Sequence, residues 1–178
     1  AGKGNLRSLE LLLDSKLNSY IPFFDEVDEV QDFLSYSFCQ SLYILAKSNN
    51  ISFEKLRDLK LSNKEIKKIK EYERINLEFI DNTPLELILY KYDKDDIHFI
   101  IDYFAYCDKK EIDIINLPIT SFNDIAITST EIISIIDKSP GPWIKDITKK
   151  LEEAILLNKI NNTEKNIVDF LEKIRDNI

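Results

Sequence analysis

The sequence predicts an all-α protein, in which a helical body is followed by a small helical tail subdomain. Three observations support this class. Gly and Pro number only 3 and 5 in 178 residues, which is too few for a β-rich chain with many tight turns. Apolar residues recur every three or four positions along most of the chain. Several segments also carry Ser or Thr followed three residues later by Glu, the capping-box pattern that marks a helix start.

The first part of the body contains a short helix, a turn and a longer helical run. Leucines at helical spacing predict a helix over Leu6–Leu13, and the segment Asn18–Pro22 then breaks the pattern with a turn. From about Glu26 to Lys47 the apolar residues again keep helical spacing. This run predicts either one long helix or two abutting helices with a break at Ser35–Ser37.

The middle of the body is marked by helix-start signals. Ser52 can cap a brief helix through Leu56. Ser62 and Glu65 form a capping-box pattern for a helix that reaches about Ile80.

The segment Thr83-Pro84-Leu85-Glu86 predicts a further helix start. Thr83 is the expected N-cap, Pro84 the first helical residue, and Glu86 the residue that closes the box.

The last helix of the body is expected to open at Asp93 and Asp96 and to be central to the core. It carries two apolar faces, formed by Ile97, Ile100, Ile101 and Phe104 on one side and by Phe99, Tyr103 and Tyr106 on the other.

At about Asn116 the pattern changes to shorter elements, so we predict a body domain over residues 1–116 and a tail subdomain over residues 117–178. In the tail, Thr128 and Glu131 form another capping box. Gly141-Pro142 starts a helix to about Asn158, and Thr163 starts the last helix.

The bulk charge and the chain ends limit the function classes. The net charge is −8 and the pI is near 4.8, which argues against broad non-specific nucleic-acid binding. There is no apolar run of about 18 residues and no cationic region followed by an apolar one, so we expect no membrane span, no secretory signal and a cytoplasmic protein. The chain begins at Ala1 rather than at Met, so we expect a piece cut or processed from a longer protein.

The sequence offers little catalytic chemistry. His98 is the single histidine, whereas nucleophilic triads, zinc motifs and metal phosphohydrolases all need histidines. Asp95 and Asp102 flank it at helical spacing, which could indicate acid-base work, but a surface histidine beside solvated carboxylates explains the same pattern. Cys39 and Cys107 lie in apolar runs and are expected to be small buried hydrophobes.

Two basic clusters remain as candidate binding surfaces. The first contains Lys60, Lys64, Lys67, Lys68 and Lys70, and the second contains Lys145, Lys149 and Lys150. Most of the first cluster falls on one helical side, a stripe that could touch a phosphate backbone. A solvated helix face is the alternative explanation.

A series of short segments resembles the C-terminal part of the bacterial CCA-adding enzymes, the tRNA nucleotidyltransferases of the Firmicutes type. In the tail these segments are Leu117-Pro118-Ile119, Ile125-Ala126-Ile127, Glu131-Ile132-Ile133, Gly141-Pro142-Trp143-Ile144, Leu151-Glu152, Ala154-Ile155 and Asn161-Asn162. In the body they are Arg7-Ser8-Leu9, Leu17-Asn18-Ser19-Tyr20-Ile21-Pro22 and Lys60-Leu61-Ser62-Asn63-Lys64. The chain departs from the family at Thr128-Ser129-Thr130, where the family usually has Asn-Gly before the acidic residue.

The resemblance implies that the catalytic half of such an enzyme is missing here. The chain has no Gly-Ser plus paired-Asp nucleotidyltransferase motif and no nucleotide-selecting neck. Mg²⁺ and CTP or ATP are therefore expected only in the missing N-terminal head and neck, with no cofactor, metal or catalytic residue in this chain.

The resemblance also implies that the chain holds tRNA by its acceptor stem and elbow. The candidate tRNA contacts are Lys60, Lys64, Lys67, Lys68, Lys145, Lys149 and Lys150. Gly141, Pro142 and Trp143 are expected to form a structural anchor, with stacking of Trp143 on a nucleobase as the alternative.

A second function class stays open beside tRNA binding. The acidic charge and the aromatic content would also suit a helical protein-interaction or dimerisation module without nucleic-acid binding. A homodimer is one form that such a module could take.

Overall fold

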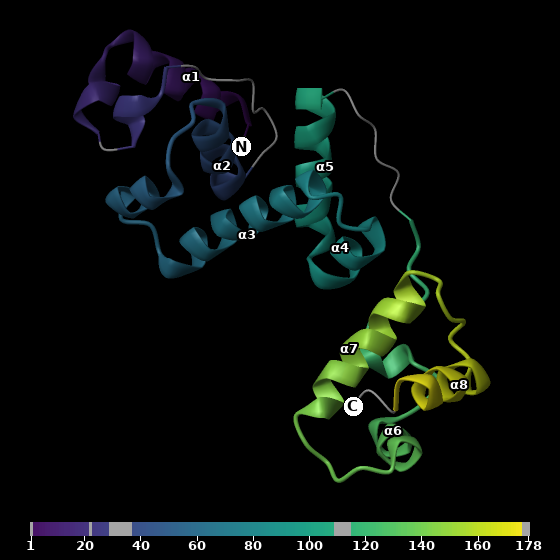
Figure 1. Cartoon of the computed structure of the whole chain (residues 1–178). Helices are drawn as coiled ribbons and strands as arrows, with labels where there is room; N and C mark the ends of the chain where they lie inside the picture. Colours follow the sequence, from purple (N-terminus) through teal and green to yellow (C-terminus); the bar gives the residue numbers. More distant parts are fainter. Residues whose placement is uncertain (1, 22, 29–36, 109–114, 176–178) are drawn as a thin grey trace. The chain divides into compact units, whose positions relative to one another are not determined.

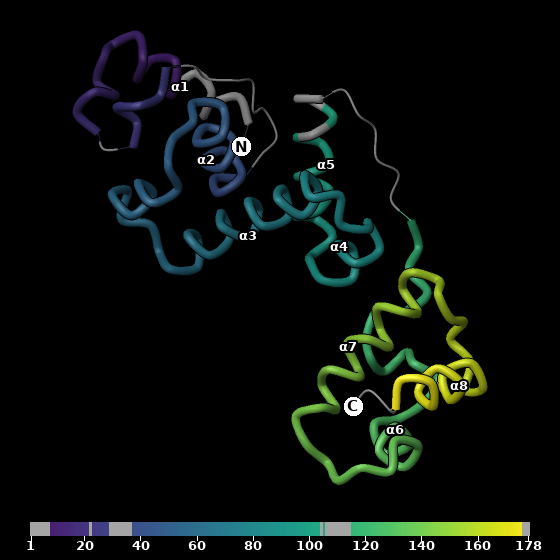
Figure 2. The backbone as a smooth tube through the Cα atoms, in the orientation of Figure 1, coloured from purple at the N-terminus to yellow at the C-terminus, as the bar shows by residue number. Residues whose placement is uncertain are grey.

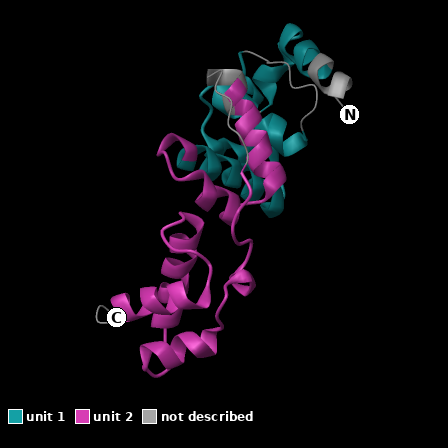
Figure 3. Cartoon of the chain, turned by 90° about the vertical axis from the view of Figure 1, so that its right-hand side faces the viewer, with its two compact units in different colours: residues 1–78 teal, residues 79–178 magenta. Residues whose placement is uncertain are grey.

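The structure is all-helical, as predicted. The computed structural model describes residues 2–21, 23–28, 37–108 and 115–175, and within these ranges it contains α-helices and short 3-10 helices but no strand (Figure 1). The chain divides into two compact units, residues 1–78 and 79–178 (Figure 3). The body–tail boundary between residues 116 and 117 stays a prediction, and residues 109–114, just before it, lie outside the described ranges.

The described residues of the first unit form three α-helices and three 3-10 helices. In chain order they are α1 (Gly2–Asp14), η1 (Leu17–Tyr20), η2 (Phe24–Glu26), α2 (Phe38–Ser48), η3 (Phe53–Leu59) and α3 (Asn63–Ile80), which ends just past the division between the units. The predicted helix over Leu6–Leu13 is confirmed by α1. The capping prediction at Ser62 is also confirmed, because the Glu65 carboxylate accepts a hydrogen bond from the Ser62 backbone N–H at 2.8 Å and the Ser62 hydroxyl accepts one from Glu65 N–H at 3.3 Å.

The predicted helical run from Glu26 is wrong at its start. Val27 is extended (φ −89°, ψ 110°) and buried, and residues 29–36 lie outside the described ranges. Helix α2 begins only after Ser37, which forms a capping box with Gln40. This start agrees with the predicted alternative of a break at Ser35–Ser37, although the sequence interpretation did not identify the capping box itself.

The core of the first unit forms around the aromatic ring of Tyr43 on α2. Tyr43 is fully buried, stacks on Phe53 with ring centroids 5.7 Å apart, and meets the edge of Tyr72 of α3 at 5.8 Å. Its hydroxyl donates to Glu73 at 3.2 Å, and the same carboxylate pairs with Lys47 at 3.2 Å. The buried ring of Tyr43 therefore links α2 to α3, and its hydroxyl group finds a hydrogen-bond acceptor at the edge of the core.

The second unit contains five α-helices and one 3-10 helix among its described residues. They are α4 (Leu85–Lys91), α5 (Lys94–Asp108), η4 (Phe122–Asp124), α6 (Ser129–Ile136), α7 (Trp143–Leu156) and α8 (Glu164–Arg175). The predicted starts at Asp93, Thr128 and Thr163 are confirmed, since each of these residues accepts the first backbone hydrogen bond of its helix. In α5 the residues Ile97, Phe99, Ile100 and Ile101 are buried, as expected for a central helix.

The predicted start of α4 at Thr83 is wrong by one residue. Pro84 has φ −51° and ψ 133°, which is not helical, and its carbonyl accepts a hydrogen bond from Ile88 N–H at 3.3 Å. Pro84 is therefore the N-cap, and no side chain caps this helix. A residue before proline is pushed away from helical angles, and here the extended geometry continues through the proline itself.

The tail helices α6, α7 and α8 pack together, as Figure 1 shows for their backbones, and they share one apolar core. Its buried members are Ile119, Ile125, Ile127, Ile132, Ile136, Ile147, Leu151, Ile155, Leu156, Ile167 and Leu171. Leu87 and Tyr90 of α4 pack against the same core. Figure 2 traces the turns between these helices.

Helices in this glycine-poor chain end on residues other than glycine. Asn50, Asn82 and Asn158 take left-handed backbone angles, with φ of 54°, 56° and 53°, after α2, α3 and α7. Asn tolerates this region better than most residues because its short side chain can bond locally. Asparagine therefore takes the left-handed position that glycine often occupies after a helix, and the chain can end these helices with few glycines.

Candidate nucleic-acid interface

Three of the four candidate lysines near the start of α3 surround one cavity. This α3 cavity has a volume of about 560 Å³ and is lined by Cys39, Ser62, Lys64, Glu65, Lys67, Lys68 and Glu71. Lys64 and Lys67 are exposed, and Lys68 is half-buried with its ammonium 5.8 Å from the centre of the Tyr72 ring. Lys60 is exposed but does not line the cavity. It takes left-handed angles (φ 52°) at the end of η3.

Acidic groups accompany the lysines in the α3 cavity. Hydrogen bonds from the side chain and backbone of Ser62 lower the pKa of Glu65 below its ordinary value of 4.5, so this carboxylate stays ionised in the capping box. The cavity therefore carries mixed charge rather than a purely positive surface.

The cysteine of this cavity is not set up as a nucleophile. Burial, followed by the charge of Glu65, raises the pKa of the Cys39 thiol above its ordinary value of 9.0. The neutral thiol is therefore favoured, whereas a reactive cysteine needs a stabilised thiolate. The side chain of Cys107 lies outside the described residues.

The second lysine cluster lies along α7. Lys145, Lys149 and Lys150 are all exposed. Lys145 and Lys149 are four residues apart and therefore share one face of the helix, while Lys150 is turned further around it. These ammonium groups are accessible to a phosphate backbone.

The helix α7 begins at the predicted anchor. Trp143 is half-buried against the tail core, and its indole N–H donates to the carbonyl of Ser139 at 2.8 Å. A methyl group added at Gly141 would lie 3.2 Å from the indole ring, so glycine lets the ring pack close to the backbone. These contacts favour anchoring over stacking, and the anchoring role of Gly141, Pro142 and Trp143 stays a prediction.

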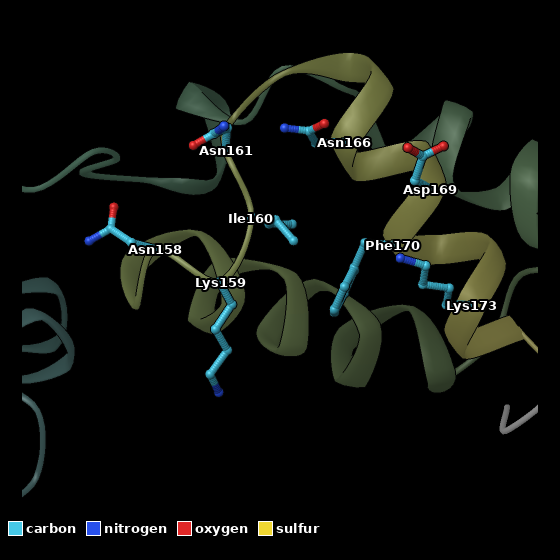
Figure 4. A pocket seen from close by; sticks show the side chains of 8 residues that line it. All are labelled: Asn158, Lys159, Ile160, Asn161, Asn166, Asp169, Phe170 and Lys173. Carbon is cyan, nitrogen blue, oxygen red and sulfur yellow. The ribbon is translucent and has the colours of Figure 1, made fainter.

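A polar cavity in the tail was missed by the sequence interpretation. This α7–α8 cavity has a volume of about 350 Å³ and is shown in Figure 4. It is lined by Asn158, Lys159, Ile160, Asn161, Asn166, Asp169, Phe170 and Lys173. The dense run of asparagines around Ile160 was the one signal in the sequence that could have indicated it.

The histidine considered for acid-base chemistry lies at the surface. His98 is exposed, as are Asp95 and Asp102 beside it, which fits the expectation of a solvated surface histidine. In the part of the chain that the structure describes, no group of three His, Cys, Asp or Glu residues is placed to hold a metal ion. No described helix combines the length and the apolar character needed to cross a bilayer.

Comparison with known proteins identifies the family. The model of the family described as "tRNA nucleotidyltransferase domain 2 putative" matches residues 38–171. A CCA-adding enzyme of Staphylococcus haemolyticus is 27% identical over 91% of this chain and 45% of the relative, and one of Listeria monocytogenes is 30% identical over 96% and 47%. The chain thus spans about half the length of these relatives.

A solved structure shares the fold. The crystal structure of Bacillus stearothermophilus CCA-adding enzyme in complex with CTP superposes with a TM-score of 0.71 at 15% identity, covering 99% of this chain and 49% of that one. At this identity the match shows the fold alone. The family match over most of the chain, together with the shared fold, shows that this chain belongs to the tRNA nucleotidyltransferase domain 2 family.

Proposed function

We propose that this chain is the tRNA-holding part of a CCA-adding tRNA nucleotidyltransferase. The chain grips the acceptor stem and elbow, while a head and neck outside it select CTP or ATP and add nucleotides to the 3′ end with Mg²⁺. The observation that carries this proposal is the family match across residues 38–171, with relatives named as CCA-adding enzymes.

The exposed lysines of both clusters support the proposal. A protein holds double-stranded RNA mainly through phosphate and 2′-hydroxyl contacts, which need placed cations rather than base-reading side chains. Lys64 and Lys67 on α3 and Lys145 and Lys149 on α7 are solvent-exposed. Local cations of this kind can bind phosphates even though the whole chain is acidic.

A salt series of tRNA binding tests this function. Affinity should fall linearly on a log–log plot as salt rises, because each phosphate contact releases counterions. Replacing Lys145, Lys149 and Lys150 together by Glu should weaken binding strongly. Lys149→Ala alone should lower the salt slope by about one, whereas Lys94→Ala, which removes an exposed lysine outside both clusters, should leave the slope unchanged.

Two results would contradict the proposal that this chain binds tRNA. One is the absence of tRNA binding at low salt, and the other is binding that does not depend on salt. The division of labour has its own check: the chain incubated with tRNA, CTP, ATP and Mg²⁺ should leave the 3′ end unextended.

A second candidate function, protein interaction or dimerisation, is favoured by apolar surface in the first unit. Tyr20, Leu17 and Phe38 are 83%, 56% and 56% exposed. A cavity of about 200 Å³ lies nearby, lined by Ser8, Leu9, Phe24, Phe38, Ser41, Leu42 and Leu45. Sedimentation across a concentration series tests a homodimer. A monomer at every concentration would exclude it, and a dimer disrupted by Phe38→Ser would support it.

A further inference from the structure

We propose that the α7–α8 cavity receives one unstacked nucleobase of the bound RNA, with Phe170 as the stacking surface. The inference rests on the proposed tRNA-holding function and adds to it a specific site and a preference for looped over fully paired RNA. The cavity lies wholly within the second unit.

The apolar part of the cavity is held in place by the tail core. Phe170 on α8 and Ile160 in the preceding turn are both partly buried and pack against that core. Figure 4 shows their side chains at the centre of the cavity. An aromatic ring fixed on one side by a core presents its other side without losing much conformational freedom, and stacking on such a ring tolerates any base.

Amide groups line the rim beside this apolar centre. Asn161 and Asn166 lie along the same edge of the cavity in Figure 4. Each side-chain amide carries both donors and an acceptor, which is the combination needed to hydrogen-bond the edge of a base. The cavity therefore combines a stacking surface with hydrogen-bonding groups at its margin, as single-stranded RNA sites do.

The charge of the cavity suits a single phosphate rather than a triphosphate. Lys173 lies one helical turn from Asp169 on α8, and both line the cavity. The other lysine, Lys159, points away from Phe170 in Figure 4, and its ammonium lies 3.8 Å from the Glu153 carboxylate. With one available ammonium beside a carboxylate, the cavity lacks the concentrated positive charge that the phosphates of CTP or ATP require.

The size of the cavity agrees with an occupant of one nucleoside. Its volume of about 350 Å³ lies at the low end of the ~300–1,000 Å³ range of small-molecule sites. A base becomes available to such a site only where RNA is unpaired, in loops, bulges or ends. The site thus favours the looped parts of a tRNA over a continuous duplex.

The test compares a tRNA transcript with a blunt RNA duplex of similar charge that has no unpaired base. Phe170→Leu should lower affinity for the tRNA about tenfold, with the affinity for the duplex and the salt slope unchanged. The matched control is Phe122→Leu, because Phe122 packs against the same core but does not line the cavity. It should leave both affinities as they are.

A second variant guards against loss of folding in Phe170→Leu. The double substitution Asn161→Ala and Asn166→Ala keeps the ring and its core packing, and it should also weaken tRNA binding alone. The inference is overturned if both variants bind the tRNA like the wild type, or if each loses tRNA and duplex equally. Failure of the proposed function looks different, because the wild-type chain would then bind neither RNA.

Discussion

The side-chain oxygen of Asn162 accepts a hydrogen bond from the backbone N–H of Ala126 at 2.9 Å. The amide nitrogen of the same side chain donates to the carbonyl of Asp124 at 2.7 Å. Asn162, in the turn before α8, therefore hydrogen-bonds the backbone of the segment that enters α6 at two points, as a neighbouring strand would do. Ile125 and Ile127 flank Ala126 and are buried in the tail core, so the contact holds both isoleucines in register.

Replacing Asn162 by Ala should destabilise the tail. Two hydrogen bonds to the backbone are lost, and a typical intramolecular hydrogen bond contributes about 0.5–1.5 kcal/mol, so we expect a loss of about 1–3 kcal/mol in the free energy of unfolding. Chemical denaturation measures this loss. The control is Asn161→Ala at the adjacent, exposed position. Equal stabilities of the two variants would show that the contact with Ala126 contributes nothing.

Replacing Tyr90 by Phe should weaken the attachment of α4 to α7. The Tyr90 hydroxyl donates to the Glu152 carboxylate at 2.5 Å, and burial, reinforced by this bond, raises the pKa of Tyr90 well above its ordinary value of 10.0. We expect a loss of about 1.5–3 kcal/mol at neutral pH, as for a hydrogen bond to a charged group. The matched control, Tyr20→Phe, changes a residue that is 83% exposed and should have no effect.

The raised pKa of Tyr90 also predicts how its contribution to stability depends on pH in the alkaline range. A pKa raised in the folded state contributes stability that is fully present below the unfolded pKa and is lost as pH rises through the folded value. The stability difference between wild type and Tyr90→Phe should therefore shrink only above about pH 10. A difference that shrinks already near neutral pH would contradict the assignment.

Replacing Glu131 by Gln should reduce the acid sensitivity of the tail. The Glu131 carboxylate accepts hydrogen bonds from the Thr128 backbone N–H at 2.6 Å and from its hydroxyl at 2.8 Å. These bonds lower the pKa of Glu131 below its ordinary value of 4.5. The resulting stability is present above pH 4.5 and is lost as pH falls through the lowered folded pKa.

Thermal melting between pH 7 and pH 2 measures this effect. The higher melting temperature of wild type relative to Glu131→Gln should disappear in acid. The control Glu172→Gln, at an exposed position on α8, should melt at the same temperature as wild type at every pH. If the difference in melting temperature between wild type and Glu131→Gln stays constant from pH 7 to pH 2, the capping carboxylate is not the titrating group.

The helix starts show what local chemistry predicts well. Ser62 with Glu65 and Thr128 with Glu131 act as capping boxes where the sequence places them, because both partners lie within one turn and need no tertiary contact. The prediction fails at Thr83, where the proline that follows keeps an extended backbone angle. At Ser37 the sequence predicted a possible break in the helical run but not the capping box with Gln40 that starts α2.

For the candidate binding surfaces, too, only the features that depend on neighbouring residues could be predicted from the sequence. Lysine spacing predicts that Lys145 and Lys149 share a helix face, since that follows from helical geometry alone. Spacing does not predict that Lys64, Lys67 and Lys68 line a cavity with Cys39, a residue of another helix. The α7–α8 cavity was missed for the same reason, because its centre needs Ile160 from a turn and Phe170 from α8.

The sequence by itself determined the all-helical class, most helix starts and the family resemblance, since these depend on neighbouring residues or on motif order. Only the tertiary structure decided that Asn162 holds Ala126, that Tyr90 reaches Glu152 across 62 residues, and that Phe170 borders a polar cavity. Contacts of this range arise from packing one apolar face against another. The pattern along a chain shows which faces are apolar but not which faces meet.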